Sequence, residues 1–225
     1  MPSLVTSYFA QSAVFGDTST LSTPSFTPAT GELIVVKAAT WDSGTPSGTP
    51  SGGSITFSQK ATAAPGGFAG YCAIFTGPVT GSPGSMSITL SAPGGSCYHS
   101  MVVERWTRAT VAASPAISSP INGNGAPTAT LTSTAPNSII TWGNVDENSR
   151  DPAGRAYLSG ATEDGLADGH SSTSSVHYFA YQTAAAAGSQ TIGMSVPNTQ
   201  NWVMVGIEIL DAPTASHGAF LPFFE

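Results

Sequence analysis

The acidic side chains gather in one segment, between Asp146 and His170, and clustered carboxylates are groups that bind calcium or cleave glycosidic bonds. These 25 residues hold six of the thirteen acids of the chain. The members that could serve as calcium ligands are Asp146, Asp151, Asp164 and Asp168. Their spacing matches no known calcium loop, so a calcium site is an alternative and not our expectation.

The same segment also has a structural interpretation. Arg150 and Arg155 are interleaved with the acids. We expect them to pair with Asp151 and Glu163 in a solvent-exposed loop between strands. A hydrolase of cell-wall polysaccharide that uses these carboxylates is the alternative that we favour least.

Two further acids, Glu104 and Glu208, occupy matching places in the two halves of the chain. Each lies among apolar residues, in Val103-Glu104-Arg105 and in Ile207-Glu208-Ile209. Alternation along a strand puts each glutamate on the face opposite its immediate neighbours. We expect both on the outer sheet face, paired with a cross-strand Arg, Lys or Thr, and keep a symmetric catalytic pair as the alternative.

Motifs of well-known catalytic sites do not occur in the chain. There is no Gly-x-Ser-x-Gly elbow, no phosphate-binding glycine-rich loop, and no Cys or His pair at zinc spacing. Of the histidines His99, His170, His177 and His217, His177 sits in an apolar strand, where we expect a hydrogen-bonded structural role. We therefore expect no enzyme, no catalytic residue, no cofactor and no resident metal.

The four tryptophans, Trp41, Trp106, Trp142 and Trp202, lie in or beside expected strands. Tryptophans on the surface of a β-sandwich can stack on sugar rings, but they more often fill the core or an edge. A module that binds host-surface carbohydrate is therefore an alternative function.

Composition points to a charge-poor protein of β-strands. Only 8% of the residues are charged, whereas the 225 residues include 31 serines and 27 threonines. Threonine is β-branched and packs well in sheets, while Ser and Thr compete with helical hydrogen bonds. The net charge of −7 and the scattered basic residues argue against nucleic acid as a partner.

Targeting and redox features are sparse. No segment approaches the roughly 18 consecutive apolar residues of a transmembrane helix, so we expect no membrane insertion. The start, Met1-Pro2-Ser3-Leu4, does not resemble a signal peptide, which suggests synthesis and folding in a cytosol. Cys72 and Cys97 make no disulfide framework, and we expect two buried free thiols, with a bridge between them as the alternative.

Short apolar runs bounded by Gly, Pro, Ser or Asn predict an all-β fold. In Ser85–Ser91 the apolar Met86, Ile88 and Leu90 alternate with hydroxyl residues and should face a core. Gln182–Gly188 is too short for an independent helix, and we expect a turn or a short helical loop there. The expected strands are Leu4–Phe9, Leu33–Trp41, Ile55–Lys60, Gly70–Thr76, Met86–Ser91, Ser100–Trp106, Thr128–Thr132, Ser138–Gly143, Ala156–Thr162, Val176–Gln182, Gln190–Val196 and Val203–Leu210.

An internal repeat of about 104 residues organises these strands. A gap-free shift places Phe75 on Phe179, Ile88 on Ile192 and Glu104 on Glu208. Each half supplies about five strands in the same order, with pseudo-repeats at about 1–110 and 111–211. We expect one jelly-roll-like antiparallel β-sandwich over residues 1–211, with two separate small sandwiches as the alternative.

The last segment, Ala212–Glu225, differs from the rest because it ends in Ala-Phe-Leu-Pro-Phe-Phe-Glu. Apolar side chains are costly to leave in water, at about 1.5–3 kcal/mol each. The tail either folds back on its own domain or docks on another protein, and Phe220, Leu221, Phe223 and Phe224 are the candidate partner-binding residues.

Three sequence segments resemble known proteins. They are Thr-Pro-Ala-Thr-Gly-Glu-Leu-Ile-Val-Val-Lys-Ala, His-Ser-Met-Val-Val-Glu-Arg-Trp and Tyr-Phe-Ala-Tyr-Gln-Thr-Ala-Ala-Ala-Ala-Gly-Ser-Gln-Thr. Through these segments, residues 3–210 of the chain resemble β-rich minor tail or capsid-associated proteins of phages that infect actinobacteria. The resemblance implies a virion structural protein, a capsid decoration or minor tail component. It would be assembled in the host bacterial cytoplasm, would contact other virion proteins and could form a homo-oligomer.

Overall fold

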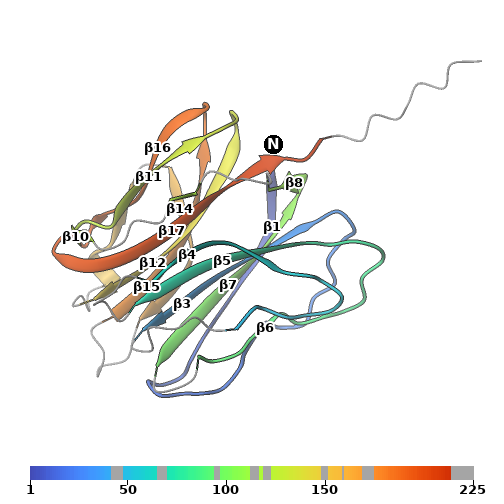
Figure 1. The fold of residues 1–225 in the computed structure, drawn as a ribbon, viewed down its shortest axis with the longest axis horizontal. Helices are drawn as coiled ribbons and strands as arrows, with labels where there is room; N and C mark the ends of the chain where they lie inside the picture. The colour runs from blue at the N-terminus through green and yellow to red at the C-terminus, as the bar shows by residue number, and fades with distance from the viewer. Residues whose placement is uncertain are drawn as a thin grey trace, which may run out of the picture.

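The fold is almost entirely β, as the sequence predicts (Figure 1). The computed structural model describes residues 1–41, 48–64, 70–93, 97–111, 117–118, 123–147, 152–158, 160–168 and 175–213. The one helical element in these ranges is a short 3₁₀ turn, η1, at Pro152–Gly154. Within the same ranges, no helix has both the length and the hydrophobicity that crossing a bilayer requires.

The N-terminal half builds the first large sheet, which is antiparallel, in the order β1-β7-β3-β5-β4. Its strands are β1 (Ser3–Gln11), β7 (Tyr98–Thr107), β3 (Leu33–Trp41), β5 (Tyr71–Pro78) and β4 (Ser58–Ala63). A small two-stranded sheet pairs β2 (Leu21–Ser22) with β6 (Thr89–Leu90). β3 lies at the centre because it pairs with both β5 and β7.

The C-terminal half builds the second large sheet, in the order β10-β17-β12-β15-β14. Its strands are β10 (Gly123–Gly125), β17 (Gln200–Asp211), β12 (Ser138–Glu147), β15 (Ser175–Ala184) and β14 (Ala161–Asp168). The short β8 (Ala109–Thr110) and β9 (Ile117–Ser118) also pair with β17. A smaller sheet joins β11 (Thr128–Ser133), β16 (Gly188–Val196) and β13 (Ala156–Tyr157).

Three apolar clusters hold these layers together. The central core lies between the two large sheets and takes residues from both, such as Val35 and Val102 from the first and Val205 and Ile207 from the second. One outer core covers the far face of the first sheet and includes residues of β2 and β6, and another covers the far face of the second sheet with residues of β11 and β16. Both faces of each large sheet are therefore buried.

The two large sheets share a strand order, but the 104-residue alignment does not preserve which face a residue occupies. β7, β3, β5 and β4 stand in the same order as β17, β12, β15 and β14. Phe75 nevertheless lies in the outer core of the first sheet, whereas Phe179 lies in the central core. Because side chains alternate along a strand, a slip of one residue exchanges the two faces. The internal repeat and the jelly-roll description stay predictions.

Most of the expected strands are present, with three differences. Leu33–Trp41 coincides with β3, and Met86, Ile88 and Leu90 are buried as predicted. The strand expected at Ile55–Lys60 begins later, as β4. The strand expected at Ala156–Thr162 is wrong, because that stretch contains β13 and only the start of β14. Met86–Ser91 is reduced to β6 and an isolated bridge between Met86 and Phe26.

One corner joins the two halves near the first residue of the chain, where β17 ends beside β8 and the start of β1 (Figure 1). The Asp211 carboxylate accepts bonds from Arg108 Nη2 at 3.0 Å and from the amino group of Met1 at 2.7 Å. The backbone nitrogen of Ala212 donates to the carbonyl of Arg108 at 2.9 Å. The last described residues therefore lie close to the first.

Candidate functional site

A charged side chain lies at the centre of the first large sheet. β3 is apolar except for Lys37 and Thr40, and all nine of its residues are buried. Alternation along the strand puts Lys37 on the same face as Val35 and Ala39, which belong to the central core. Because a buried charge is costly unless it is paired, Lys37 requires charged partners in that core.

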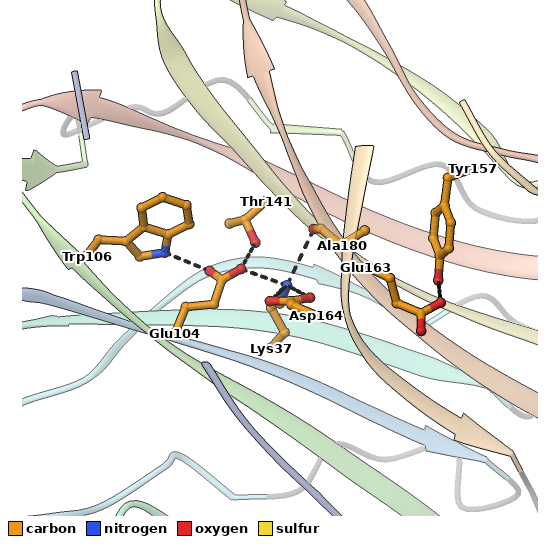
Figure 2. Close-up of polar contacts among 8 residues, drawn as sticks. All are labelled: Lys37, Glu104, Trp106, Thr141, Tyr157, Glu163, Asp164 and Ala180. Carbon is orange, nitrogen blue, oxygen red and sulfur yellow. Dashed lines mark hydrogen bonds and ion pairs between the residues drawn. The ribbon is translucent and has the colours of Figure 1, made fainter. Parts of the chain in front are cut away.

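Those partners come from both sheets, and together with Lys37 they form the buried ionic cluster: Lys37, Glu104 and Asp164 (Figure 2). Lys37 Nζ donates to Glu104 Oε1 at 2.8 Å and to the two oxygens of Asp164 at 2.7 and 2.8 Å. A longer contact of 3.4 Å reaches the carbonyl of Ala180. None of the three side chains is more than 3% exposed.

Neighbouring donors hold the Glu104 carboxylate in place. Thr141 Oγ1 in β12 donates to Glu104 Oε1 at 2.8 Å, and Trp106 Nε1 in β7 donates to Oε2 at 2.9 Å. Both oxygens of Glu104 are therefore hydrogen-bonded, and Oε1 serves Thr141 and Lys37 together. Together with Thr141, the cluster connects β3 and β7 of the first sheet with β12 and β14 of the second.

Asp164 reaches the cluster because β14 contains a β-bulge. The pairing of β14 with β15 shifts register between Glu163 and Gly165, and bulges of this kind redirect a side chain. Glu163 points away from the cluster, and its carboxylate accepts from the hydroxyl of Tyr157 at 2.6 Å (Figure 2). The same carboxylate accepts from Arg155 Nη2 at 2.8 Å. Asp164, the next residue, faces Lys37.

Gly165 allows the sheets to approach closely at this bulge. A Cβ atom there would overlap Val102 Cγ2 and would lie 3.1 Å from Phe9 Cδ2. A side chain at this position would push β14 away from the first sheet and so lengthen the Asp164–Lys37 contacts.

The charges of the cluster do not balance unless one proton is added, because two carboxylates share one ammonium group. Burial would raise the pKa of Glu104, but Lys37 and the hydrogen bonds outweigh it and the pKa falls below its ordinary value. Burial raises the pKa of Asp164 to about 8; Lys37 opposes this change and the Glu104 carboxylate adds to it. Burial also acts to lower the pKa of Lys37, but the two acids raise it. The opposite directions of these two shifts favour Asp164 over Glu104 as the carboxyl group that holds the extra proton.

The prediction that Glu104 and Glu208 lie on the outer sheet face fails for Glu104, which points into the central core. Its partners do include a Lys and a Thr, as expected. Glu208 points the other way, under the turn between β11 and β12, and accepts from the Thr134 and Ala135 backbone nitrogens and the Thr134 and Ser138 hydroxyls. Since they lie on different faces of different sheets, the two glutamates do not form a catalytic pair.

The candidate calcium ligands are dispersed. Asp146 and Asp168 lie on the outer face of the second sheet, with Val176 of β15 between them, whereas Asp164 faces the central core. Asp151 lies outside the described residues. The described ranges hold no group of three or more His, Cys, Asp or Glu side chains placed to bind a metal ion.

The prediction that the segment from Asp146 to His170 is a solvent-exposed loop is wrong. The segment contains β13 and β14, and the side chains of Asp146 and Asp164 are buried. The expected pairing of Arg155 with Glu163 is confirmed. Arg150 and His170 lie outside the described residues.

The outer core of the second sheet holds buried polar atoms that the protein does not pair. Trp142 Nε1, Asn144 Oδ1, Asp146 Oδ2 and Trp202 Nε1 make no hydrogen bond within the described part of the chain. Asp146 Oδ1 accepts from the Val176 backbone nitrogen at 3.1 Å. Burial raises the pKa of Asp146 to about 8, so this carboxyl group is mostly protonated at neutral pH.

The remaining residues that the sequence singles out are structural where they are described. His177 is buried and its Nδ1 lies 2.7 Å from Ser100 Oγ, which confirms a hydrogen-bonded histidine. All four tryptophans are at most 8% exposed, so none is available to stack on a sugar. Cys72 and Cys97 are buried and not joined by a disulfide. The tail residues Phe220, Leu221, Phe223 and Phe224, and His217, lie outside the described residues.

Sequence reasoning missed Lys37 as a site residue. Its signal was available, because it is the only charged residue of β3.

No protein-family model matches the chain, and no curated protein and no solved structure matches it either.

Proposed function

We propose that the chain is a structural component of a phage particle, a capsid decoration or minor tail protein that acts through contacts with other particle proteins. The observation that supports this proposal most is the position of the buried ionic cluster in the fold. Its charged groups are enclosed between two sheets, where they connect the two halves of the chain. A protein that must withstand forces in a particle benefits from such connections.

Other polar groups of the described residues also fasten one part of the fold to another. Glu208 holds the turn between β11 and β12, and Glu32, directly before β3, accepts from Arg105 Nε of β7 at 2.9 Å. Asp211 ties β17 to Arg108. This use of scarce charges for cohesion supports a structural role.

The resemblance to virion proteins of actinobacterial phages supports the same function. Two of its sequence segments contain cluster residues: one includes Lys37, and another includes Glu104 together with its hydrogen-bond donor Trp106. These segments include parts of β3, β7 and β15, which are inner strands of the large sheets, and the third also runs into β16 of the smaller sheet. The carbohydrate-binding alternative has no such support, because the tryptophans that suggested it are buried.

The test is to find the chain in purified particles of the phage that encodes it. Particles are banded in a density gradient, digested and measured by quantitative peptide mass spectrometry, and immunogold labelling then locates the chain on capsid or tail. We expect a constant copy number per particle. A chain that is abundant in infected cells but missing from washed particles would refute the proposal.

A further inference from the structure

The amine of Lys37 and the carboxyl of Asp164 face each other directly in the central core. The nitrogen contacts both carboxyl oxygens, at 2.7 and 2.8 Å, and the carbon between them is therefore also close to it. Reacting groups held at about 3–3.5 Å are in position for bond formation. We propose that Lys37 and Asp164 condense to an amide, a covalent bond that joins the two large sheets.

Burial makes this condensation more favourable than it is in water. In water, an amine and a carboxylic acid are both stabilised as solvated ions, which disfavours the amide. Here the two side chains are 0% and 3% exposed, so their charged forms lose that solvation. The amide would replace an enclosed ion pair with a neutral group, and the water released would pass to the solvent.

Glu104 is placed to carry the protons of the reaction. Its Oε1 lies 2.8 Å from Lys37 Nζ, within reach for direct proton transfer. Trp106 and Thr141 hold the carboxylate in that orientation. The raised pKa of Asp164 keeps its carboxyl protonated, and this supplies a hydroxyl group that can depart as water.

The steps balance without an outside reagent. The Lys37 ammonium gives a proton to the Glu104 carboxylate, and the neutral amine attacks the carboxyl carbon of protonated Asp164. Glu104 then protonates the departing hydroxyl, a C–O bond breaks, and water leaves. The new amide nitrogen then loses its extra proton to Glu104, which ends protonated. No group is oxidised or reduced.

The bond would connect residues that are 127 positions apart in the chain. It would join β3, at the centre of the first sheet, to β14 at the edge of the second. The inference goes beyond the proposed function and does not depend on a place in a phage particle.

The test is the intact mass of the purified full-length chain, measured under denaturing conditions. We expect the sequence mass less one water molecule. Trypsin cannot cleave after Lys37 once its amine is an amide, so the digest should contain residues 1–60 linked to residues 156–225. A wild-type chain at the full sequence mass, or a water loss that maps to other residues, overturns the proposal.

Variants assign the roles. Lys37→Arg keeps the positive charge with a guanidinium group, and Asp164→Ala removes the carboxyl; both should have the full mass expected from their sequences. Glu104→Gln keeps both reacting groups and should also have full mass, with circular dichroism confirming a β fold. Complete water loss in Glu104→Gln would overturn the assignment of Glu104. The linked peptide of the wild type tests the bond itself, even if a variant fails to fold.

Discussion

Replacing Asp146 with Asn should stabilise the protein at neutral pH and above. The carboxyl of Asp146 is buried, and only its Oδ1 accepts a hydrogen bond that the structure shows, from the backbone of Val176. An asparagine oxygen can accept the same bond, and the amide carries no charge to bury. The variant therefore removes the free-energy cost of burying an ionised carboxylate and keeps the hydrogen bond from the Val176 backbone.

The magnitude follows from the change in pKa on folding. Burial raises the pKa of Asp146 from 3.8 to about 8, so between these values the folded state binds more protons than the unfolded state. Stability then falls as pH rises through this window, by about 1.4 kcal/mol per pH unit for one group. At pH 7 the variant should be more stable than the wild type by up to about 4 kcal/mol, and the difference should vanish near pH 4.

Urea denaturation of both proteins at half-unit steps from pH 4 to pH 9 measures this difference. Every other titrating group is common to the two proteins, so the difference between their free energies of unfolding reports the titration of Asp146 alone. Asp168→Asn is the matched control, because it makes the same chemical change at an exposed position on the same face of the sheet. A difference between wild type and Asp146→Asn that stays constant with pH would refute the reasoning.

Three other substitutions or deletions test particular contacts. Gly165→Ala should destabilise the fold by about 1–3 kcal/mol in urea denaturation, because its Cβ would overlap Val102, whereas Gly84→Ala, with open space around it, should have little effect. Glu208→Gln should cost about 1.5–3 kcal/mol at pH 7, because an ionised acceptor is lost. That difference should shrink as pH falls through the lowered folded pKa of Glu208, and a loss independent of pH would contradict it. Deleting residues 214–225 should leave a folded, soluble protein that no longer joins particles; full occupancy in particles would show that the tail is not the docking element.

The sequence predicts strands better than it predicts which way their side chains point. Both ends of β3 could be predicted because the strand is apolar except for Lys37 and Thr40 and is bounded by turn residues. Such runs occur where both faces of a sheet are buried, and the same property removes the contrast between an inner and an outer face. For this reason Glu104 was assigned to the wrong face, and the repeat alignment matched Phe75 with a residue on the opposite side.

The buried ionic cluster could be predicted only in part. Lys37 was recognisable as a charge in an apolar strand, and Glu104 as an acid in another. Their pairing with Asp164 depends on a bulge in β14 and on the packing of one sheet against the other, which bring together residues far apart in the chain. Asp164 was instead grouped with the acids nearest to it in sequence.

The corner held by Asp211 bears on how the protein can be labelled. A reporter fused before Met1 would emerge beside Ala212, and it would crowd the start of the segment whose docking is to be tested. The turn near Gly81 and Gly84 is exposed and has room for added atoms, so an epitope inserted there would leave that corner clear. Experiments that detect the protein in assembled particles should place the epitope in that turn.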